Sequence, residues 1–347
     1  MRIEDFNARI QNTILVADGA MGSLLHESVG PQRCFEELNL QQPEAVFRVH
    51  RAYIQAGAQI IETNTFGANR LKLTASGLGD QVTRINLGGV KIAREAREGA
   101  GHEVMIAGSI GPSGVSRHMS EISFDDLRAA FREQAQALEE RGVDLFLLET
   151  FTDIEELMAA IEAIRAFSNL PIMAQMTFSE EGTAAGGTRP EEAAARLATA
   201  NVQVIGTNCT LGPQPLLPII EELSRGAGAI PRSAMPNVGF PRRMGDRTVY
   251  PRSSPEYFAH FAQEAAALGV RILGGCCGTT PEHIRAMADA VKKLAPGRAV
   301  HVASNAAAVA EAPLRIAKRE PESGIWKKIQ ARQFVTSVEI DPPKGIA

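Results

Sequence analysis

Short apolar segments alternate with segments of helical periodicity along most of this chain, and this alternation limits the folds it can adopt. Eight apolar runs bounded by Gly, Pro or Asn occupy residues 14–17, 59–62, 104–108, 145–149, 171–176, 202–206, 233–237 and 270–274. Segments with helical spacing follow them, at residues 43–55, 124–138, 154–164, 190–198, 215–223, 255–268 and 281–291. Several open with Pro in the first turn, which is a helix-start signal. Strands that each lead into a helix are typical of α/β proteins with a parallel sheet.

Polar and reactive residues stand at the carboxyl ends of nearly all the predicted strands. They are Asp18, Glu62, Thr63, Asn64, Ser109, Glu149, Thr150, Asn208, Cys209, Asn237, Cys276 and Cys277. A doubly wound open sheet would spread these residues along a crevice, whereas a closed barrel brings all strand ends to one mouth. We therefore predict an α/β fold of the (β/α)8 TIM-barrel type over residues 1–295.

The composition changes after residue 295. Residues 296–332 begin with a stretch rich in Ala, Arg, Glu and Pro that has no clear period, which indicates a linker. Residues 334–340 then alternate like a strand and run into Asp341-Pro342-Pro343. Because this strand has no partner before the chain stops at Ala347, we interpret residues 333–347 as the truncated start of a further domain.

Bulk composition narrows the function classes. The 347 residues are 44% hydrophobic and 22% charged, as in an ordinary globular protein. A net charge of −4 argues against nucleic acid and anionic membrane surfaces as partners, since both require concentrated Lys and Arg. The first residues have no apolar signal-peptide core, and no apolar run approaches the roughly 20 residues that span a bilayer. We expect a cytoplasmic protein and leave its oligomeric state open.

Three of the four cysteines, Cys209, Cys276 and Cys277, each end a short apolar run, whereas Cys34 is solitary and is expected to be a small buried residue. A catalytic zinc site takes three protein ligands and keeps a fourth position open for substrate. Adjacent cysteines can reach one ion only if the strand ends there and the backbone turns, and the glycines around the pair allow this. The spacing alone leaves both a metal site and ordinary buried cysteines open.

Six motifs stand in order at the predicted strand ends. They are Asp18-Gly19-Ala20-Met21-Gly22, Glu62-Thr63-Asn64-Thr65-Phe66, Gly108-Ser109-Ile110-Gly111-Pro112, Leu148-Glu149-Thr150, Gly206-Thr207-Asn208-Cys209 and Gly274-Gly275-Cys276-Cys277-Gly278. On these motifs residues 10–295 resemble the homocysteine S-methyltransferase family, which includes betaine–homocysteine methyltransferase and the homocysteine module of cobalamin-dependent methionine synthase. The resemblance implies a Zn2+ barrel with Cys209, Cys276 and Cys277 as ligands. It also implies that homocysteine is methylated to methionine.

A thiolate ligand set suits this chemistry. Thiolates rather than thiols are nucleophiles, and a free thiol has a pKa of about 8.5. Zinc with an open position would bind the homocysteine sulfur and displace its proton near neutral pH. Three thiolate ligands would leave that sulfur electron-rich enough to attack a methyl carbon. No histidine base is required for this displacement.

The amino-acid part of the substrate also needs partners. By resemblance, Asp18 and Glu149 bind the homocysteine ammonium group, and Glu62 could share this task. Asn208 precedes a predicted zinc ligand and is expected to orient the site through hydrogen bonds.

Backbone N–H groups are our candidates for the substrate carboxylate. Helix starts and Gly-rich turns present such groups to anions. Ala20 and Met21 form one candidate, and the turn at residues 108–111, which includes Ser109, forms the other.

The methyl donor is less constrained. A sulfonium or quaternary ammonium donor would favour aromatic faces, and Phe66 and Phe151 lie in or near the predicted mouth loops. We favour S-methylmethionine or S-adenosylmethionine because a sulfonium leaving group needs little activation. However, residues 334–343 resemble the first strand of methylenetetrahydrofolate reductase, in which a glutamate matching Glu339 serves catalysis. This resemblance suggests a fusion with a reductase domain, and a folate-derived methyl group is the alternative.

Two rival functions remain. A Schiff-base aldolase needs a lysine in the barrel mouth, and the lysines at 72, 91, 292, 293 and beyond 317 are expected in a loop, helices or the tail. A non-catalytic zinc-binding or redox-sensing module would bind the metal without methylating homocysteine.

Overall fold

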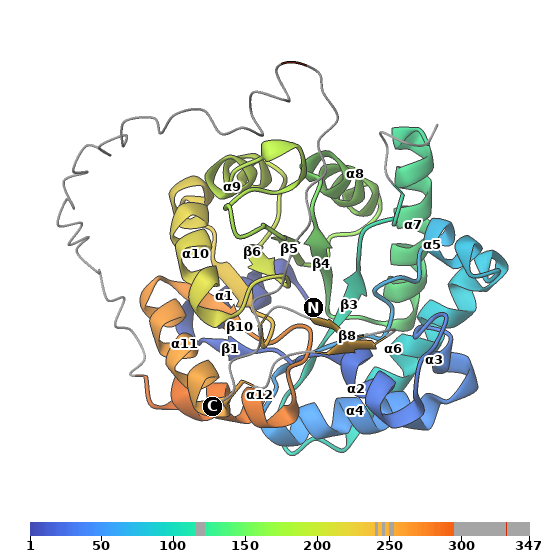
Figure 1. The fold of residues 1–347 in the computed structure, drawn as a ribbon. Helices are drawn as coiled ribbons and strands as arrows, with labels where there is room; N and C mark the ends of the chain where they lie inside the picture. Colours follow the sequence, from blue (N-terminus) through green and yellow to red (C-terminus); the bar gives the residue numbers. More distant parts are fainter. Residues whose placement is uncertain (116–121, 240–241, 245–246, 250–252, 295–330, 332–347) are drawn as a thin grey trace. The chain divides into compact units, whose positions relative to one another are not determined.

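The computed structural model describes residues 1–115, 122–239, 242–244, 247–249, 253–294 and 331 (Figure 1). The described barrel belongs to one compact unit, Met1–His301. The predicted linker and reductase-like strand lie outside the described residues, apart from Ala331. Their boundaries therefore stay predictions.

Eight parallel strands form the central sheet. They are β1 (Leu15–Val16), β2 (Ile60–Glu62), β3 (Met105–Ile110), β4 (Leu145–Phe151), β5 (Ile172–Met176), β6 (Val204–Asn208), β7 (Arg232–Met235) and β10 (Val270–Leu273). Their order in the sheet is β1-β10-β7-β6-β5-β4-β3-β2, so consecutive parallel strands are neighbours.

The two end strands of this order also meet. Ala17, just after β1, forms a parallel bridge with Ile60 of β2. The N–H of Asp18 donates to the carbonyl of Ile60 at 3.0 Å, and the N–H of Gln59 donates to the carbonyl of Val16 at 2.7 Å. The sheet therefore closes on itself, and the predicted (β/α)8 barrel is confirmed (Figure 1).

Helices cover the outside of the barrel between successive strands. They are α2 (Met21–Val29), α3 (Leu38–Gln41), α4 (Pro43–Ala56), α5 (Arg70–Ala75), α6 (Val82–Glu98), α7 (Phe124–Arg141), α8 (Ile154–Arg165), α9 (Pro190–Ala198), α10 (Pro213–Ala227), α11 (Pro255–Ala267) and α12 (Pro281–Lys292). Proline occupies the first turn of α4, α9, α10, α11 and α12, as the helix-start signals predicted.

Helix α6 was not predicted from the sequence, because small and polar residues interrupt the apolar residues of its buried face. Among its buried residues are Asn86, Gly89, Ala93 and Ala96. Asn86 is fully buried, and its side-chain amide donates to the carbonyls of Ala68 and Val82. A helix is recognised in a sequence by large apolar residues that recur at helical spacing, and small or polar residues at core positions interrupt this recurrence.

A helix at the N-terminus, α1 (Ile3–Asn12), closes one end of the barrel. Its Phe6 and Ile10 are fully buried in the same cluster as inward-facing residues of all eight strands, which include Leu15, Ile60 and Met105. Because α1 leads directly into β1, this cluster fills the amino ends of the strands. The carboxyl ends are left to form the mouth.

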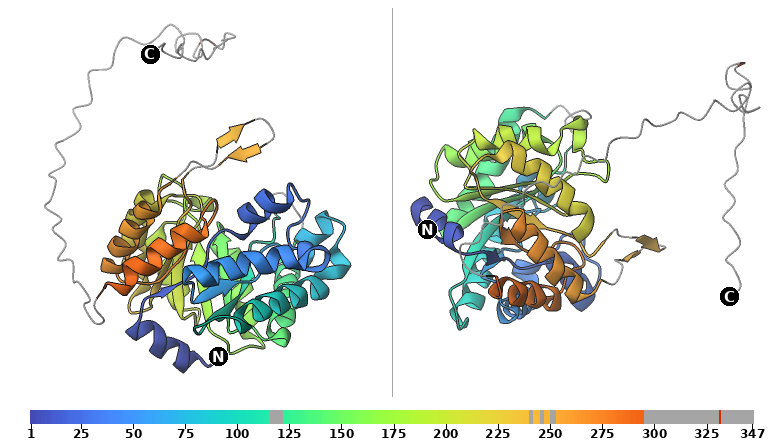
Figure 2. Two further views of the ribbon diagram at one scale, coloured as in Figure 1. Left: turned by 90° about the horizontal axis from the view of Figure 1, so that it is seen from below. Right: turned by 90° about the vertical axis from the view of Figure 1, so that its left-hand side faces the viewer.

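An antiparallel hairpin, which the sequence analysis did not predict, lies between β7 and α11. It consists of β8 (Arg242–Met244) and β9 (Arg247–Val249), and Figure 2 shows it projecting from the helical layer. Within the described residues, no helix is long and apolar enough to cross a membrane.

Replacing Phe6 by Ala should lower the free energy of unfolding by about 3–5 kcal/mol, because a fully buried ring would leave a cavity at the closed end of the barrel. Urea unfolding followed by circular dichroism measures this loss. Leu40→Ala is the control, since Leu40 is 36% exposed and its replacement should cost less than about 0.5 kcal/mol. Equal stabilities for the two variants would contradict the role of α1.

Candidate functional site

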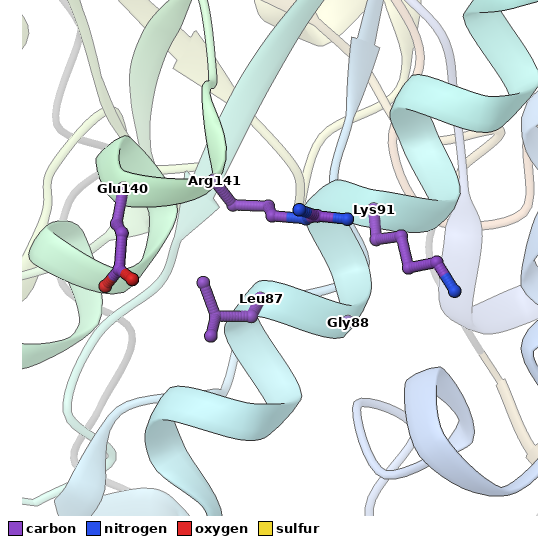
Figure 3. Close-up of a pocket in the computed structure, with 5 residues that line it drawn as sticks. All are labelled: Leu87, Gly88, Lys91, Glu140 and Arg141. Atoms are coloured by element: carbon purple, nitrogen blue, oxygen red, sulfur yellow. The ribbon is translucent and has the colours of Figure 1, made fainter.

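The outer surface carries one cavity that does not belong to the barrel mouth. It has a volume of about 300 Å3 and lies between α6 and α7, lined by Leu87, Gly88, Lys91, Glu140 and Arg141 (Figure 3). The last two residues end α7 and precede β4, so the cavity lies toward the amino ends of the strands. The predicted site residues lie at the opposite ends.

The three predicted zinc ligands come together at the mouth. Cys209 follows β6, and Cys276 and Cys277 follow β10. Their three Sγ atoms lie within 4.8 Å of one another, and the Sγ atoms of Cys209 and Cys277 are 3.9 Å apart. Zn–S bonds of about 2.3 Å in a tetrahedron place sulfur atoms roughly 3.8 Å apart. The spacing therefore fits a bound zinc ion.

The backbone at Cys209 is held in an unfavourable conformation. Cys209 and Thr210 have φ values of +63° and +55°, in the left-handed region that side chains other than Gly rarely occupy. Each such residue costs on the order of 1–2 kcal/mol. The Cys209 N–H donates to the carbonyl of Met235 at 3.0 Å, and the N–H of Leu211 donates to the carbonyl of Cys209 at 2.6 Å. These bonds hold the strained turn that directs Cys209 toward the other two cysteines.

The turn at Cys276 and Cys277 uses its glycines in two ways. Gly278 has a φ of +78°, so it supplies the backbone freedom that the sequence predicted. Gly275 instead provides space, since a Cβ there would lie 2.5 Å from Oγ1 of Thr279. That hydroxyl donates to the carbonyl of Cys276 at 2.7 Å. Close packing of Thr279 therefore fixes the cysteine turn.

The thiols resist ionisation without a cation. Hydrogen bonds with Cys209 and Cys277, together with burial, raise the pKa of Cys276 well above its usual range. Three thiolates this close together repel one another, and a divalent cation would remove this repulsion. The donor set is therefore suited to a thiophilic metal such as zinc.

Three carboxyl groups gather beside the cysteines. Asp18 and Glu149 are buried, and the carboxylate of Asp18 accepts the N–H of Glu62 at 3.0 Å. Glu62 and Glu149 share a hydrogen bond between their carboxyl groups. Burial, together with the charge of Glu149, raises the pKa values of Asp18 and Glu62 well above their ordinary range. Among the described residues, Oδ1 of Asp18 and Oε1 of Glu62 have no hydrogen-bond donor, so the cluster can accept a cationic group.

Ser109 and Asn208 hold Glu149 in place. The hydroxyl of Ser109 donates to Oε1 of Glu149 at 2.5 Å, and the amide of Asn208 donates to Oε2 at 3.2 Å. The same amide lies 3.9 Å from Sγ of Cys276 and 2.8 Å from Oγ1 of Thr150. Asn208 therefore connects the carboxyl cluster with the cysteines.

The candidate anion-binding backbone groups are mostly occupied. The N–H of Ala20 donates to Oγ1 of Thr279 at 3.1 Å, and its carbonyl accepts the hydroxyl of Tyr53. The N–H of Ser109 donates to Oγ1 of Thr63. Met21 begins α2, where first-turn N–H groups have no partner within the helix. The structure thus leaves Met21 as the more accessible of the predicted backbone donors.

The two predicted donor-pocket aromatics lie in different places. Phe151 is fully buried and packs against Phe131 of α7, with ring centroids 5.9 Å apart. Regular alternation from Leu147 would point this ring into the barrel, but Thr150 has a φ of +61° and the pairing of β4 with β5 shifts register between Leu148 and Phe151. The ring therefore faces the helical layer. Phe66 is half-buried in the loop after β2, and its ring carries Nζ of Lys72 at 4.5 Å from the centroid. Phe151 therefore has no surface for a donor, and a cation already occupies one face of Phe66.

Lys72 is a mouth residue that the sequence analysis placed in a loop away from the site. It lies in α5, and its charge lowers the pKa of Glu149. Its side chain reaches the mouth by passing over Gly114, a contact that the sequence spacing does not reveal.

Cys34 is half-buried and lies apart from the other three cysteines. Its thiol donates to the carboxylate of Glu36 at 3.2 Å, and it packs at the edge of a small apolar cluster.

Burial raises the pKa of Glu149 to about 7, against the lowering effect of its hydrogen bond with Ser109. In the unfolded state this carboxyl group has a pKa near 4.5. Between pH 4.5 and about pH 7 the native state therefore keeps a proton that the unfolded state has released. This contribution to stability is present below pH 4.5 and is lost as the pH rises through 7. The melting temperature of metal-free protein should fall from about pH 5 to about pH 8 by a larger amount than that of Glu149→Gln. Parallel curves for the two proteins would contradict the raised pKa.

Known proteins resemble this chain over the whole barrel. The family of homocysteine S-methyltransferases matches residues 15–291. Methionine synthase of Mycobacterium leprae is 32% identical over 308 residues, which are 84% of this chain and 26% of that protein. Methionine synthase of Mycobacterium tuberculosis is 33% identical over 300 residues, 82% of this chain and 25% of that protein. The chain thus spans about a quarter of the length of these relatives.

Solved structures agree with this assignment. The homocysteine methyltransferase MmuM from Escherichia coli in its metallated form is 27% identical, with a TM-score of 0.67, over 80% of this chain and 96% of that chain. Its oxidized form is 26% identical, also with a TM-score of 0.67, over 79% and 94% of the two chains. With the family match covering residues 15–291, this chain belongs to the homocysteine S-methyltransferase family.

Proposed function

We propose that this chain binds zinc through Cys209, Cys276 and Cys277 and transfers a methyl group from a small-molecule donor to the sulfur of homocysteine, forming methionine. The observation that carries the proposal is the convergence of three Sγ atoms within 4.8 Å beside a buried carboxyl cluster. Sulfur ligands and an acidic pocket together match an amino acid that carries a thiol and an ammonium group.

The cysteines would supply the metal site for the thiol end of the substrate. When bound, zinc supplies positive charge that lowers the pKa of the homocysteine thiol and keeps its sulfur nucleophilic near neutral pH. The three cysteines stand at two strand ends and would hold the ion with three of four tetrahedral positions, so that the fourth would be open to the substrate. The structure of the turns at Cys209 and Cys276 keeps these ligands in place before substrate arrives.

The carboxyl cluster would bind the ammonium group. Asp18, Glu62 and Glu149 lie together at the mouth, and buried acceptor oxygens of Asp18 and Glu62 lack donors among the described residues. An ammonium ion offers three N–H donors, so it can satisfy several of these oxygens at once. Ser109 and Asn208 then act by fixing the orientation of the Glu149 carboxylate.

Methyl transfer is a displacement at carbon. The sulfur lone pair forms the new S–C bond while the bond from the methyl carbon to the donor breaks, and that electron pair leaves with the donor. The thiol proton is released to solvent. The protein contributes mainly by holding the sulfur and the amino-acid backbone in one orientation, which lowers the entropic part of the reaction barrier.

Two donor classes compete. A sulfonium donor, S-methylmethionine or S-adenosylmethionine, needs least activation and remains our preferred class on chemical grounds. A folate-derived methyl group is the alternative, supported by the resemblance of residues 334–343 to a reductase strand. The ammonium of Lys72 over the Phe66 ring gives no support to a sulfonium bound at that ring, since two cations would repel one another.

Purified protein should contain about one zinc per chain. Cys209→Ser and Cys277→Ser should lose most of this zinc and all methionine formation, because two thiolates do not replace three. Metal analysis and a chromatographic methionine assay measure both effects. Cys34→Ser is the matched control and should retain zinc and activity, since Cys34 contacts Glu36 rather than the cluster. A fully active Cys209→Ser protein would contradict the proposal.

A panel of methyl donors tests the reaction and the donor class together. It includes S-methylmethionine, S-adenosylmethionine, betaine, and methyltetrahydrofolate with and without cobalamin. Methionine should form with at least one donor in zinc-loaded protein and with none after chelation. Full zinc loading without turnover for any donor would favour the rival zinc-binding or redox-sensing module.

A further inference from the structure

A bound amino acid presents a carboxylate as well as an ammonium group, and apart from the first turn of α2 at Met21, candidate N–H groups near the mouth already have acceptors. The N–H of Ala20 donates to Thr279. The N–H of Gly111 donates to the carbonyl of Phe66 at 2.8 Å. A carboxylate that enters this partly buried region is stabilised by a cation, because burial otherwise disfavours its charged form.

Lys72 provides such a cation. Its Nζ lies 4.5 Å from the centroid of the Phe66 ring. That ring packs on Gly111, two residues after Ser109, whose hydroxyl donates to Glu149. Among the described residues, the carboxylate of Glu36 lies beside the Lys72 side chain at Gly67, but it accepts the N–H of Gly67 and the thiol of Cys34, and no ion pair with Lys72 is formed. The ammonium group is therefore available to an anion that comes from outside the protein.

The surrounding loops are shaped around this lysine and its aromatic platform. A Cβ at Gly114 would contact the Lys72 side chain at 3.3 Å, and the φ of Gly114 is +78°. A Cβ at Gly111 would overlap the ring of Phe66. On the other side of the loop, Glu156 of α8 accepts the N–H of Ser113 at 2.7 Å. The two glycines leave the space that the Lys72 side chain and the Phe66 ring occupy, and the hydrogen bond ties the same loop to α8.

We propose that Lys72 binds a substrate carboxylate at the barrel mouth, with the Phe66 ring as the platform that orients its ammonium group. This inference rests on the proposed function, because it assumes that the carboxyl cluster takes the substrate ammonium. In an amino acid the ammonium and carboxylate are bonded to one carbon. A substrate ammonium at Glu149 would therefore keep its carboxylate in the part of the mouth where Ser109 contacts Glu149 and Gly111, two residues later, contacts Phe66.

Two substrates can supply this carboxylate. One source is homocysteine itself, and the other is the methyl donor, since the sulfonium, betaine and folate donors all carry carboxylates. Kinetics with each substrate varied separately distinguishes them. The acceptor 3-aminopropane-1-thiol, which is homocysteine without its carboxylate, adds a direct comparison.

The variants are Lys72→Met and Lys72→Gln, which keep much of the side-chain length without the charge, and Lys72→Arg, which keeps the charge. Lys91→Met is the matched control, because Lys91 lies on α6 with 58% of its side chain exposed. Loss of a charged hydrogen bond should lower kcat/KM for the relevant substrate roughly 10–100-fold in the uncharged variants. Lys72→Arg should retain most of the wild-type value, and all variants should keep full zinc content.

Homocysteine is identified as the source of the carboxylate if two results are found. The KM for homocysteine rises in the uncharged Lys72 variants, and these variants and the wild type have equal kcat/KM with 3-aminopropane-1-thiol. The donor is identified if only the donor KM rises. The inference is overturned if both uncharged variants match Lys91→Met for both substrates, or if they lose zinc and melt at lower temperature like a structural variant.

Calorimetric binding to zinc-loaded protein separates this inference from the proposed function. Absence of turnover with every donor would count against the proposed function. Homocysteine and each donor can still be titrated into the wild type and the Lys72 variants. Weaker binding to both uncharged variants than to Lys91→Met supports the role of Lys72, and equal binding of all ligands overturns it.

Discussion

The proximity of three cysteine sulfur atoms is the constraint on which the rest of the mouth depends. Sulfur atoms 3.9 Å apart, such as those of Cys209 and Cys277, cannot all be ionised without a cation between them. The chain accepts two left-handed residues, Cys209 and Thr210, to bring the first ligand into position. Such strained residues persist only where the surrounding structure holds them, and they cluster at functional sites. The strained backbone at Cys209 and Thr210 is therefore consistent with a binding site.

Acidic groups that become negatively charged on ionisation are concentrated around this site. The thiols and the carboxyl groups of Asp18, Glu62 and Glu149 lie close together, and burial makes their ionisation costly. Metal and substrate ammonium would neutralise this charge, so their binding would be coupled through Asn208, which lies near both Glu149 and Cys276. Lys72 adds a positive group at the edge of this region. With the proposed zinc and the proposed role of Lys72, the mouth would be complementary to a zwitterion that carries a thiol.

The barrel was predictable because its main signals are local. Each strand is a short apolar run, five helices begin with proline, and the reactive residues stand at strand ends. The convergence of Cys209 with Cys276 and Cys277 followed from the barrel topology, since β6 and β10 flank β7 in the sheet. In contrast, α6 was missed because Asn86 and Gly89 interrupt its apolar pattern, and α1 was missed because two residues, Phe6 and Ile10, carry its packing.

The finer features of the site depend on side-chain direction, which the sequence does not specify. Phe151 was predicted near the donor but faces α7, because the strand is irregular between Leu148 and Phe151 and Thr150 has a φ of +61°. Lys72 was predicted in a loop but reaches the mouth over Gly114. The N–H of Ala20 was predicted to be available but bonds to Thr279, which is 259 residues away in the sequence. Each difference arises from a contact between distant segments.

X-ray absorption at the zinc edge tests the central claim most directly, because it counts the sulfur atoms around the metal. With Zn–S distances of about 2.3 Å, zinc-loaded protein alone should show three sulfur neighbours and one lighter atom. Addition of homocysteine should raise the sulfur count to four as its thiol takes the open position. A count that stays at three with saturating homocysteine, or that falls below three without it, would contradict the account.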